Sequence, residues 1–191
     1  MIADFLERLK ERPVIASIRS AKDLEQAIVS EAAAVFLLGG SLMTLPSLVE
    51  RARITGKYVF VHLDLCDGLG KDQAAVDWVS HVLRPDGLIS TRPQLLKRAR
   101  ENELITIQRL FLMDSESLTN GVRLLKNVSP DLVEVLPGLV PKAIRQLKST
   151  LGLPVIAGGM VTEEADVLQA LEAGAAAVSS SVSGLWTMRN R

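Results

Sequence analysis

Short apolar runs alternate with amphipathic segments along the whole chain. Eight of these runs have the length of strands, and most are rich in β-branched residues. They are Val14–Ile18, Val35–Leu38, Tyr58–Leu65, Gly87–Thr91, Ile105–Leu112, Leu132–Leu136, Pro154–Ala157 and Ala176–Ser179. The segments between them carry apolar residues at helical spacing, as Leu24, Ala27 and Ile28 do. The helices predicted there are Lys22–Ala33, Leu45–Thr55, Gln73–Val82, Gln94–Glu101, Ser115–Asn127, Val140–Thr150 and Glu163–Ala173.

Strand-like runs joined by helices predict parallel strands connected by right-handed crossovers. A closed barrel and an open doubly wound sheet both fit this order. The count of eight favours the barrel, and so does the absence of a Gly-x-Gly-x-x-Gly turn after Val14–Ile18. We therefore expect an α/β protein in which residues 1–191 form a single, short (β/α)8 TIM barrel. Residues 1–12 are predicted to form a leading helix, and Ser183–Arg191 a reduced last helix.

Composition narrows the class of protein further. Lysine plus arginine equals aspartate plus glutamate at 22 each, so no global positive field attracts nucleic acid, and RNA contact would need a local basic patch. The single cysteine, Cys66, excludes an intramolecular disulfide and a zinc cluster of thiolates within one chain. No apolar run approaches the ~20 residues of a membrane span, and no signal peptide is visible. We expect a cytoplasmic protein without membrane contact, metal or cofactor.

The carboxyl ends of the predicted strands carry most of the polar residues, and this is the end where barrels of this kind bind ligands. The seventh and eighth strands end in Gly158-Gly159 and Ser179-Ser180-Ser181. Glycines leave backbone N–H groups accessible to an anion, and serine hydroxyls add neutral donors. We therefore expect Gly158, Gly159, Ser179, Ser180 and Ser181 to bind a phosphate group. The alternative is that the glycines form only a tight turn and the serines only a polar helix start.

Charged residues at other strand ends are candidates for further ligand contacts. Asp64 begins a glycine-containing loop, and we expect it to contact a ligand. Glu134 lies between two valines, so its carboxylate needs a partner, which Arg109 or Arg92 could provide; structural pairing and binding of a ligand hydroxyl both remain open. His62 is expected to be a hydrogen-bonded core residue. Ser17 and Arg19 end the first strand, and Cys66 has no evident base beside it and is interpreted as an inert thiol.

Several motifs together resemble the bacterial glycerol uptake operon antiterminator family. They are Val59–Leu65, Gly87–Arg92, the Gln-Arg-Leu-Phe block from Gln108 to Ser115, the Glu-Val-Leu-Pro-Gly block of Val133–Gly138, Pro154–Gly159 and the serine run with Leu185-Trp186. The resemblance covers nearly the whole chain. It implies a non-enzymatic barrel that senses glycerol 3-phosphate and acts on leader mRNA so that transcription passes a terminator.

Carried over residue by residue, the resemblance implies that Gly158, Gly159 and Ser179–Ser181 hold the phosphate. Asp64, Arg109, Glu134 and Arg92 are then candidates for the rim around the glycerol moiety. The family usually has Ser-Thr-Ser at the end of the eighth strand, where this chain has Ser179-Ser180-Ser181, so a hydroxyl is retained at the middle position.

The resemblance therefore predicts a glycerol 3-phosphate-responsive antiterminator that binds the leader mRNA of a glycerol-utilisation operon. The alternative is a small barrel enzyme, an isomerase or lyase, that uses Asp64 and Glu134 as acid and base. A third hypothesis is a binding protein that keeps the ligand pocket without RNA contact. The sequence does not determine whether the chain acts as a monomer or as a homo-oligomer.

Overall fold

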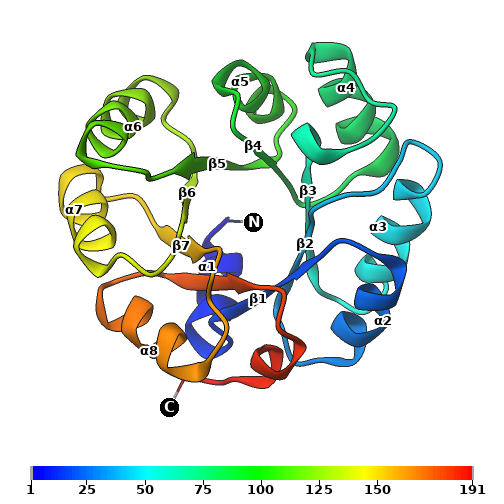
Figure 1. Cartoon of the computed structure of the whole chain (residues 1–191). Coiled ribbons are helices and arrows are strands. Elements are labelled where there is room, and N and C mark those ends of the chain that lie inside the picture. The colour runs from blue at the N-terminus through cyan, green and yellow to red at the C-terminus, as the bar shows by residue number, and fades with distance from the viewer. Residues whose placement is uncertain (1, 191) are drawn as a thin grey trace.

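The computed structural model describes residues 2–190, and its centre is a closed barrel of eight parallel strands (Figure 1). The strands follow one another around the barrel in sequence order, and β1 pairs with β8 to close it. They are β1 (Val14–Ile18), β2 (Ala34–Leu37), β3 (Tyr58–His62), β4 (Gly87–Ser90), β5 (Ile105–Phe111), β6 (Leu132–Leu136), β7 (Val155–Gly158) and β8 (Ala177–Ser180). The predicted (β/α)8 barrel is confirmed.

Helices surround the barrel, and α1 lies at its centre in the view down the barrel axis (Figure 1). The α-helices are α1 (Ile2–Glu11), α2 (Ala21–Val29), α3 (Leu45–Arg53), α4 (Gln73–Trp78), α5 (Pro93–Glu101), α6 (Ser115–Val128), α7 (Pro141–Leu151) and α8 (Glu164–Glu172). A single 3-10 turn, η1 (Leu63–Leu65), follows β3, and the π-helical turn η2 (Val79–Leu83) continues α4. The reduced last helix expected after β8 is the short 3-10 helix η3 (Ser183–Thr187).

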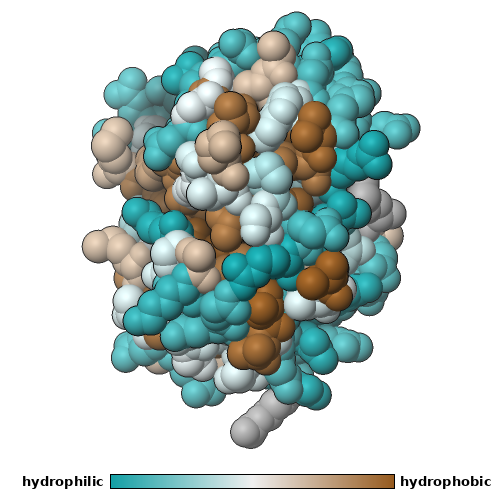
Figure 2. Space-filling model, turned by 90° about the vertical axis from the view of Figure 1, so that its right-hand side faces the viewer, coloured by the Kyte–Doolittle hydropathy of each residue, from teal (hydrophilic) through white to brown (hydrophobic). Residues whose placement is uncertain are grey.

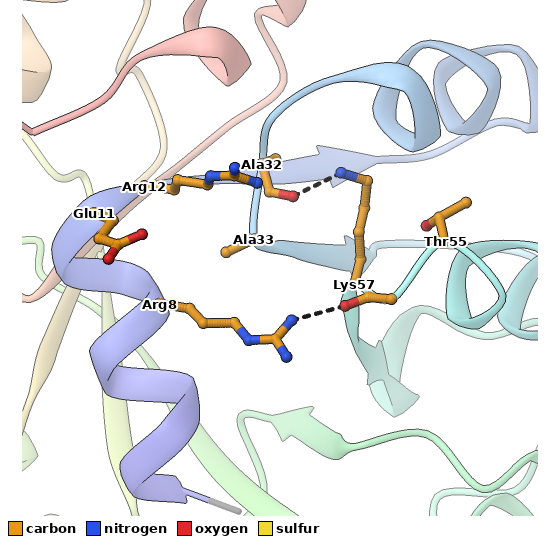
Figure 3. Close-up of a pocket in the computed structure, with 8 residues that line it drawn as sticks. Arg8, Glu11, Arg12, Ala32, Ala33, Thr55 and Lys57 are labelled. Carbon is orange, nitrogen blue, oxygen red and sulfur yellow. Dashed lines mark hydrogen bonds between the residues drawn. The ribbon is translucent and has the colours of Figure 1, made fainter.

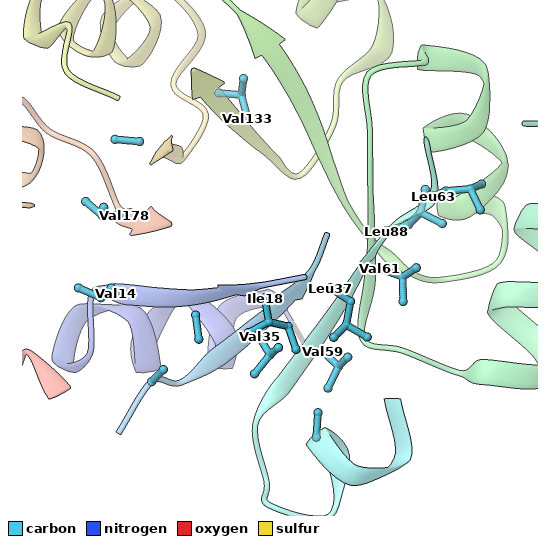
Figure 4. Close-up of a cluster of buried hydrophobic side chains, with 14 of the residues drawn as sticks. Val14, Ile18, Val35, Leu37, Val59, Val61, Leu63, Leu88, Val133 and Val178 are labelled. Atoms are coloured by element: carbon cyan, nitrogen blue, oxygen red, sulfur yellow. The ribbon is translucent and has the colours of Figure 1, made fainter. Parts of the chain in front are cut away.

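Side chains of each strand alternate between the barrel interior and the surrounding helices, as the pleat requires. Outward-facing residues such as Val35 and Val59 pack in one cluster with the helices (Figure 4). Inward-facing residues such as Phe36 and Phe60 form a second cluster, which also contains Phe5 of α1. The Phe5 and Phe60 ring centroids are 4.9 Å apart. Because α1 inserts this ring into the amino-terminal end of the barrel, it closes that end with apolar surface.

The interior layer nearer the carboxyl ends of the strands is polar. This layer consists of five buried side chains, each from a different strand: Ser17, His62, Arg109, Glu134 and Ser179. Each lies two residues after an inward-facing apolar residue, so the alternation places it inside the barrel, directly above the apolar layer. A buried polar layer costs desolvation unless its groups find partners or a ligand, which directs attention to this end of the molecule.

Several element ends differ from the sequence prediction. The helix expected to run to Ala33 ends at Val29. The third strand was expected to run to Leu65, but β3 ends at His62 and the chain turns, with the Cys66 N–H donating to the Leu63 carbonyl. Asp64 therefore lies in the turn that follows β3 and not on the strand itself. The fourth helix ends in a π turn because Arg84 adopts a left-handed conformation, with φ 52°, and its N–H donates to the Val79 carbonyl.

The face of the molecule shown in Figure 2 is mostly hydrophilic, with separate hydrophobic patches. Between residues 2 and 190, no helix combines the length and the hydropathy needed to span a bilayer.

Candidate functional site

A cavity of about 220 Å³ lies at the carboxyl ends of β1 and β5 to β8. Its lining residues are Ser17, Arg19, Leu38, Arg109, Glu134, Leu136, Gly159, Met160, Val161, Thr162, Ser179, Ser180 and Ser181. The volume is below the roughly 300–1,000 Å³ of sites for drug-sized ligands, so it limits an occupant to a small molecule. The cavity stands where barrels of this class hold their ligands.

The floor of this cavity contains a buried ion pair. The Arg109 Nε donates to Glu134 Oε2 over 2.7 Å, and the two side chains are 6% and 1% exposed. The second oxygen, Glu134 Oε1, accepts a hydrogen bond of 2.6 Å from the Ser179 hydroxyl. Of the two partners that the sequence left open for Glu134, the structure selects Arg109.

Gly158 is required by this network. A Cβ at position 158 would lie 2.5 Å from Ser179 Oγ and 2.7 Å from Glu134 Oε1. Any other residue would therefore displace the carboxylate or the hydroxyl. Gly158 belongs to the site because it leaves room for Glu134 inside the barrel.

The loop after β7 turns sharply at the rim of the cavity. Gly159 and Met160 both have positive φ, 72° and 63°. This region is strained for methionine, and the Met160 side chain is 71% exposed, so burial of that side chain does not explain the conformation. Strain of this kind concentrates at ligand-binding segments.

Three groups at the cavity are available to a ligand. The hydroxyls of Ser17 and Ser181 and the guanidinium of Arg19 form no hydrogen bond within the described part of the chain. Since Arg109 and Glu134 neutralise each other, Arg19 gives the lining a net positive charge. The sequence placed Arg19 at this rim but did not assign it a role, because a solitary arginine after a strand is usually a solvated side chain.

The serines of β8 differ in what they contact. The Ser180 hydroxyl donates to the Val161 carbonyl over 2.8 Å and also accepts from the Val182 N–H. It therefore joins the loops after β7 and β8, while Ser179 is bound to Glu134. Ser181 is exposed at the rim. Phosphate binding by the glycine pair and the three serines stays a prediction. Of these five residues, Gly159 with its backbone N–H and Ser181 with its hydroxyl have the donors that are most available to a ligand.

Asp64 and Arg92 do not line this cavity and form a separate cluster after β3 and β4. The Asp64 carboxylate accepts hydrogen bonds from the Ser90 hydroxyl and from the N–H and hydroxyl of Thr91. Arg92 Nε lies 3.5 Å from its other oxygen. Asp64 thus joins the ends of two strands, and its ligand contact remains a prediction.

His62 is buried as expected, at 2% exposure, but its Nδ1 has no hydrogen-bond partner. The expectation of a hydrogen-bonded core histidine is therefore wrong. Asp64 Oδ2 is 3.9 Å away, too far for a hydrogen bond. Burial and, after it, the nearby Arg109 cation lower the pKa of His62 to about 3, so the imidazole is neutral at physiological pH.

Cys66 behaves as the sequence indicated. Its thiol is buried and donates to the His62 carbonyl, and burial raises its pKa to about 11. A thiol in this state is a poor nucleophile. Over residues 2–190, His, Cys, Asp and Glu side chains nowhere gather in threes that could hold a metal ion.

Comparison with known proteins identifies the family. Residues 14–186 match the family model described as glycerol-3-phosphate responsive antiterminator. The chain belongs to this family. The match covers all eight strands and thus the complete cavity, so the glycerol-3-phosphate responsive antiterminator family shares the part of the chain that forms the site.

Solved structures agree with this assignment. A glycerol uptake operon antiterminator regulatory protein from Listeria monocytogenes is 35% identical, with a TM-score of 0.88 over 92% of this chain and 95% of that one. A glycerol uptake operon antiterminator-related protein from Thermotoga maritima is 31% identical, with a TM-score of 0.81 over 93% of this chain and 99% of that one.

An uncharacterized Escherichia coli protein, YgcP, is 35% identical over 97% of both chains. Aldolases and an epimerase at 14–16% identity share the barrel fold alone.

Proposed function

We propose that this chain is a glycerol 3-phosphate-responsive antiterminator that binds the leader mRNA of a glycerol-utilisation operon. The observation that carries the proposal is the small cavity with one uncompensated cation, Arg19, in a member of a family described by its response to glycerol 3-phosphate. A phosphate monoester carries up to two negative charges near neutral pH, and it needs donors and positive charge in the same place.

The phosphate is proposed to bind at the rim. There the N–H groups of Gly159 and Met160 and the Ser181 hydroxyl supply neutral donors, and Arg19 supplies charge. Charge-assisted hydrogen bonds from guanidinium to phosphate are among the strongest in proteins. Gly158, Ser179 and Ser180 support this rim from below through their contacts with Glu134 and Val161.

The glycerol moiety is proposed to extend toward the floor of the cavity. Glu134 can accept from a ligand hydroxyl while it keeps Arg109, and Ser17 can donate or accept beside it. Asp64 and Arg92, in the separate cluster after β3 and β4, are proposed as further contacts for the glycerol moiety.

The test of the proposal is a mobility-shift assay with the leader transcript across a salt series, with and without glycerol 3-phosphate. We expect the ligand to strengthen RNA binding, and the affinity to fall steeply with salt because backbone phosphates are contacted. Glycerol without phosphate serves as the control ligand. The absence of a ligand-dependent shift at low salt contradicts the proposal, and ligand binding without any RNA effect selects a binding protein instead.

The enzyme alternative, with Asp64 and Glu134 as acid and base, receives less support. Glu134 is buried and paired with Arg109, and Asp64 holds the ends of β3 and β4 from a different cluster. Each carboxylate thus already has structural partners. Membership of an antiterminator family favours a regulator.

A further inference from the structure

A second cavity, of about 470 Å³, lies at the opposite end of the barrel, between α1 and the amino-terminal ends of β2 and β3. Its charged lining consists of Arg8, Arg12 and Lys57 with Glu11 (Figure 3). Arg8 and Arg12 extend from α1 and the residue after it, and they reach toward Lys57 across the space (Figure 3). The cavity therefore has more cations than carboxylates.

These cations are held in place by neutral groups. The Lys57 ammonium donates to the carbonyls of Ser30 and Ala32 over 2.7 Å each. The Arg12 guanidinium donates to the Glu31 carbonyl over 3.3 Å. Carbonyl oxygens orient a cation but do not neutralise it, so both charges persist in the cavity.

Carboxylates compensate these charges only in part. The Glu31 carboxylate is bound to Arg189 and acts on Arg12 and Lys57 from a greater distance. Arg8 has Asp4 3.4 Å from its Nε, but its Nη1 is directed to the Gly56 carbonyl, 2.9 Å away. Within residues 2–190, neither Arg12 nor Lys57 forms an ion pair with a carboxylate.

The half-buried Lys57 shows the effect of this arrangement. Burial lowers its pKa, and repulsion from Arg12 lowers it further. A bound anion would relieve both effects, since it would offset the desolvation and screen the two cations from each other. An adjoining cavity of about 310 Å³ shares Arg8 and Lys57 and adds Arg53 together with the carboxylate of Asp86, so cations also outnumber carboxylates in its lining.

We infer that this cavity is a phosphate site for the RNA backbone, so that RNA docks at the amino-terminal end of the barrel while the effector binds at the carboxyl end. The inference rests on the proposed RNA function. Because the net charge of the chain is zero, RNA contact requires a local excess of cations, and this cavity provides one together with space for a phosphate group.

Other basic residues offer less. On α5, Arg98 is paired with Asp77 and Glu101. On α7, Lys142 and Arg145 are exposed side chains that line none of the cavities described above. Arg8 and Arg12 precede residue 14, where the family match begins, so the site is inferred from this chain's own residues.

The experiment compares salt-dependent RNA binding of the full chain, with glycerol 3-phosphate present, in two double variants. Arg12→Gln with Lys57→Gln removes the inferred site, and Lys142→Gln with Arg145→Gln removes the same charge from α7. We expect the first variant to bind the leader RNA at least tenfold more weakly and to lower the salt slope by roughly 0.7–0.9 for each lost phosphate contact. We expect the α7 variant to retain the wild-type slope.

Calorimetry with glycerol 3-phosphate establishes that each variant is folded, because the effector pocket is distant from both substitutions. Arg53→Gln, a change at an exposed residue, provides a second variant and should reduce the salt slope of RNA binding without loss of stability.

Equal salt slopes in wild type and the first double variant would overturn the inference, and so would an equal loss of slope in the α7 variant. Loss of binding to inorganic phosphate with unchanged RNA affinity would show that a free anion, not RNA, occupies the site. If wild type binds the effector but no RNA at all, the proposed function itself fails.

Discussion

Arg19 is the residue on which effector binding most depends in this account. It is the one lining cation without a carboxylate partner in the described structure of the effector cavity. Replacing Arg19 with Gln should weaken the binding of glycerol 3-phosphate about ten- to hundredfold, because a charge-assisted hydrogen bond contributes about 1.5–3 kcal/mol. Calorimetry measures the change, with Lys22→Gln as a control that removes an exposed charge nearby. Equal affinity in the Arg19 variant and wild type would contradict the assignment.

Gly158 tests the steric side of the same site. Gly158→Ala should destabilise the fold by about 1–3 kcal/mol, since the added methyl group displaces Glu134 or Ser179. Effector affinity should fall with it. Urea unfolding and calorimetry measure the two effects. Gly184→Ala, where a Cβ meets nothing within 4 Å, is the matched control and should change neither.

His62 predicts a pH dependence of stability. Its pKa is lowered to about 3 in the folded state by burial and by Arg109, whereas the ordinary value is 6.5. Between these values the unfolded chain binds the proton and the folded chain does not, so the free energy of unfolding falls as pH drops from about 6.5 toward 3. Above about pH 6.5 the neutral His62 no longer lowers the free energy of unfolding. Between the two pKa values, this free energy changes by up to about 1.4 kcal/mol per pH unit.

Denaturant unfolding at several pH values measures this dependence. His62→Gln should flatten the slope in this window, whereas His81→Gln, on an exposed residue, should retain it. An unchanged slope in the His62 variant would show that the neutral, buried imidazole is not its source.

At the scale of elements, α1 acts as the closure of the barrel. Phe5 is fully buried against Tyr58 and Phe60. Phe5→Ala should lower the free energy of unfolding by about 3–5 kcal/mol, because it leaves a cavity beneath the strands. Phe111→Ala, at a side chain that is 56% exposed, is the control and should cost far less. A similar loss in both variants would mean that α1 does not close the barrel.

The elements and their order could be predicted from the sequence because the two periodicities are clear. Apolar runs with β-branched residues indicated every strand, and the barrel followed from their number. The end of β3 could not be predicted, since it depends on Asp64 meeting Ser90 and Thr91 from the next strand. The π turn after α4 likewise depends on the left-handed Arg84.

The candidate site could be predicted in part. The sequence indicated which rim is polar, because strand ends are visible in the pattern. It did not show that Glu134 takes Arg109 as its partner, since that choice depends on register between β5 and β6. Nor did it show that Asp64 lies in a different cluster or that α1 and Lys57 form a second cationic cavity, because both depend on distant segments meeting in space.

At the scale of the whole molecule, the chain has no net charge, but two cavities at opposite ends of the barrel each have an excess of cations in their lining. We propose that the effector binds at the carboxyl end and RNA at the amino-terminal end. Such a separation requires that effector binding changes RNA affinity through the barrel and α1, and the reciprocal effect must then be equal in free energy. RNA should therefore strengthen effector binding by the same factor.

The most direct test of the central claim is a crystal structure of the protein soaked with glycerol 3-phosphate. The account predicts the phosphate group at the rim, within hydrogen-bonding distance of the Gly159–Met160 backbone, Ser181 and Arg19, with the glycerol hydroxyls toward Glu134. Ligand density only at Arg12 and Lys57, or no density at the carboxyl end at saturating concentration, would contradict it.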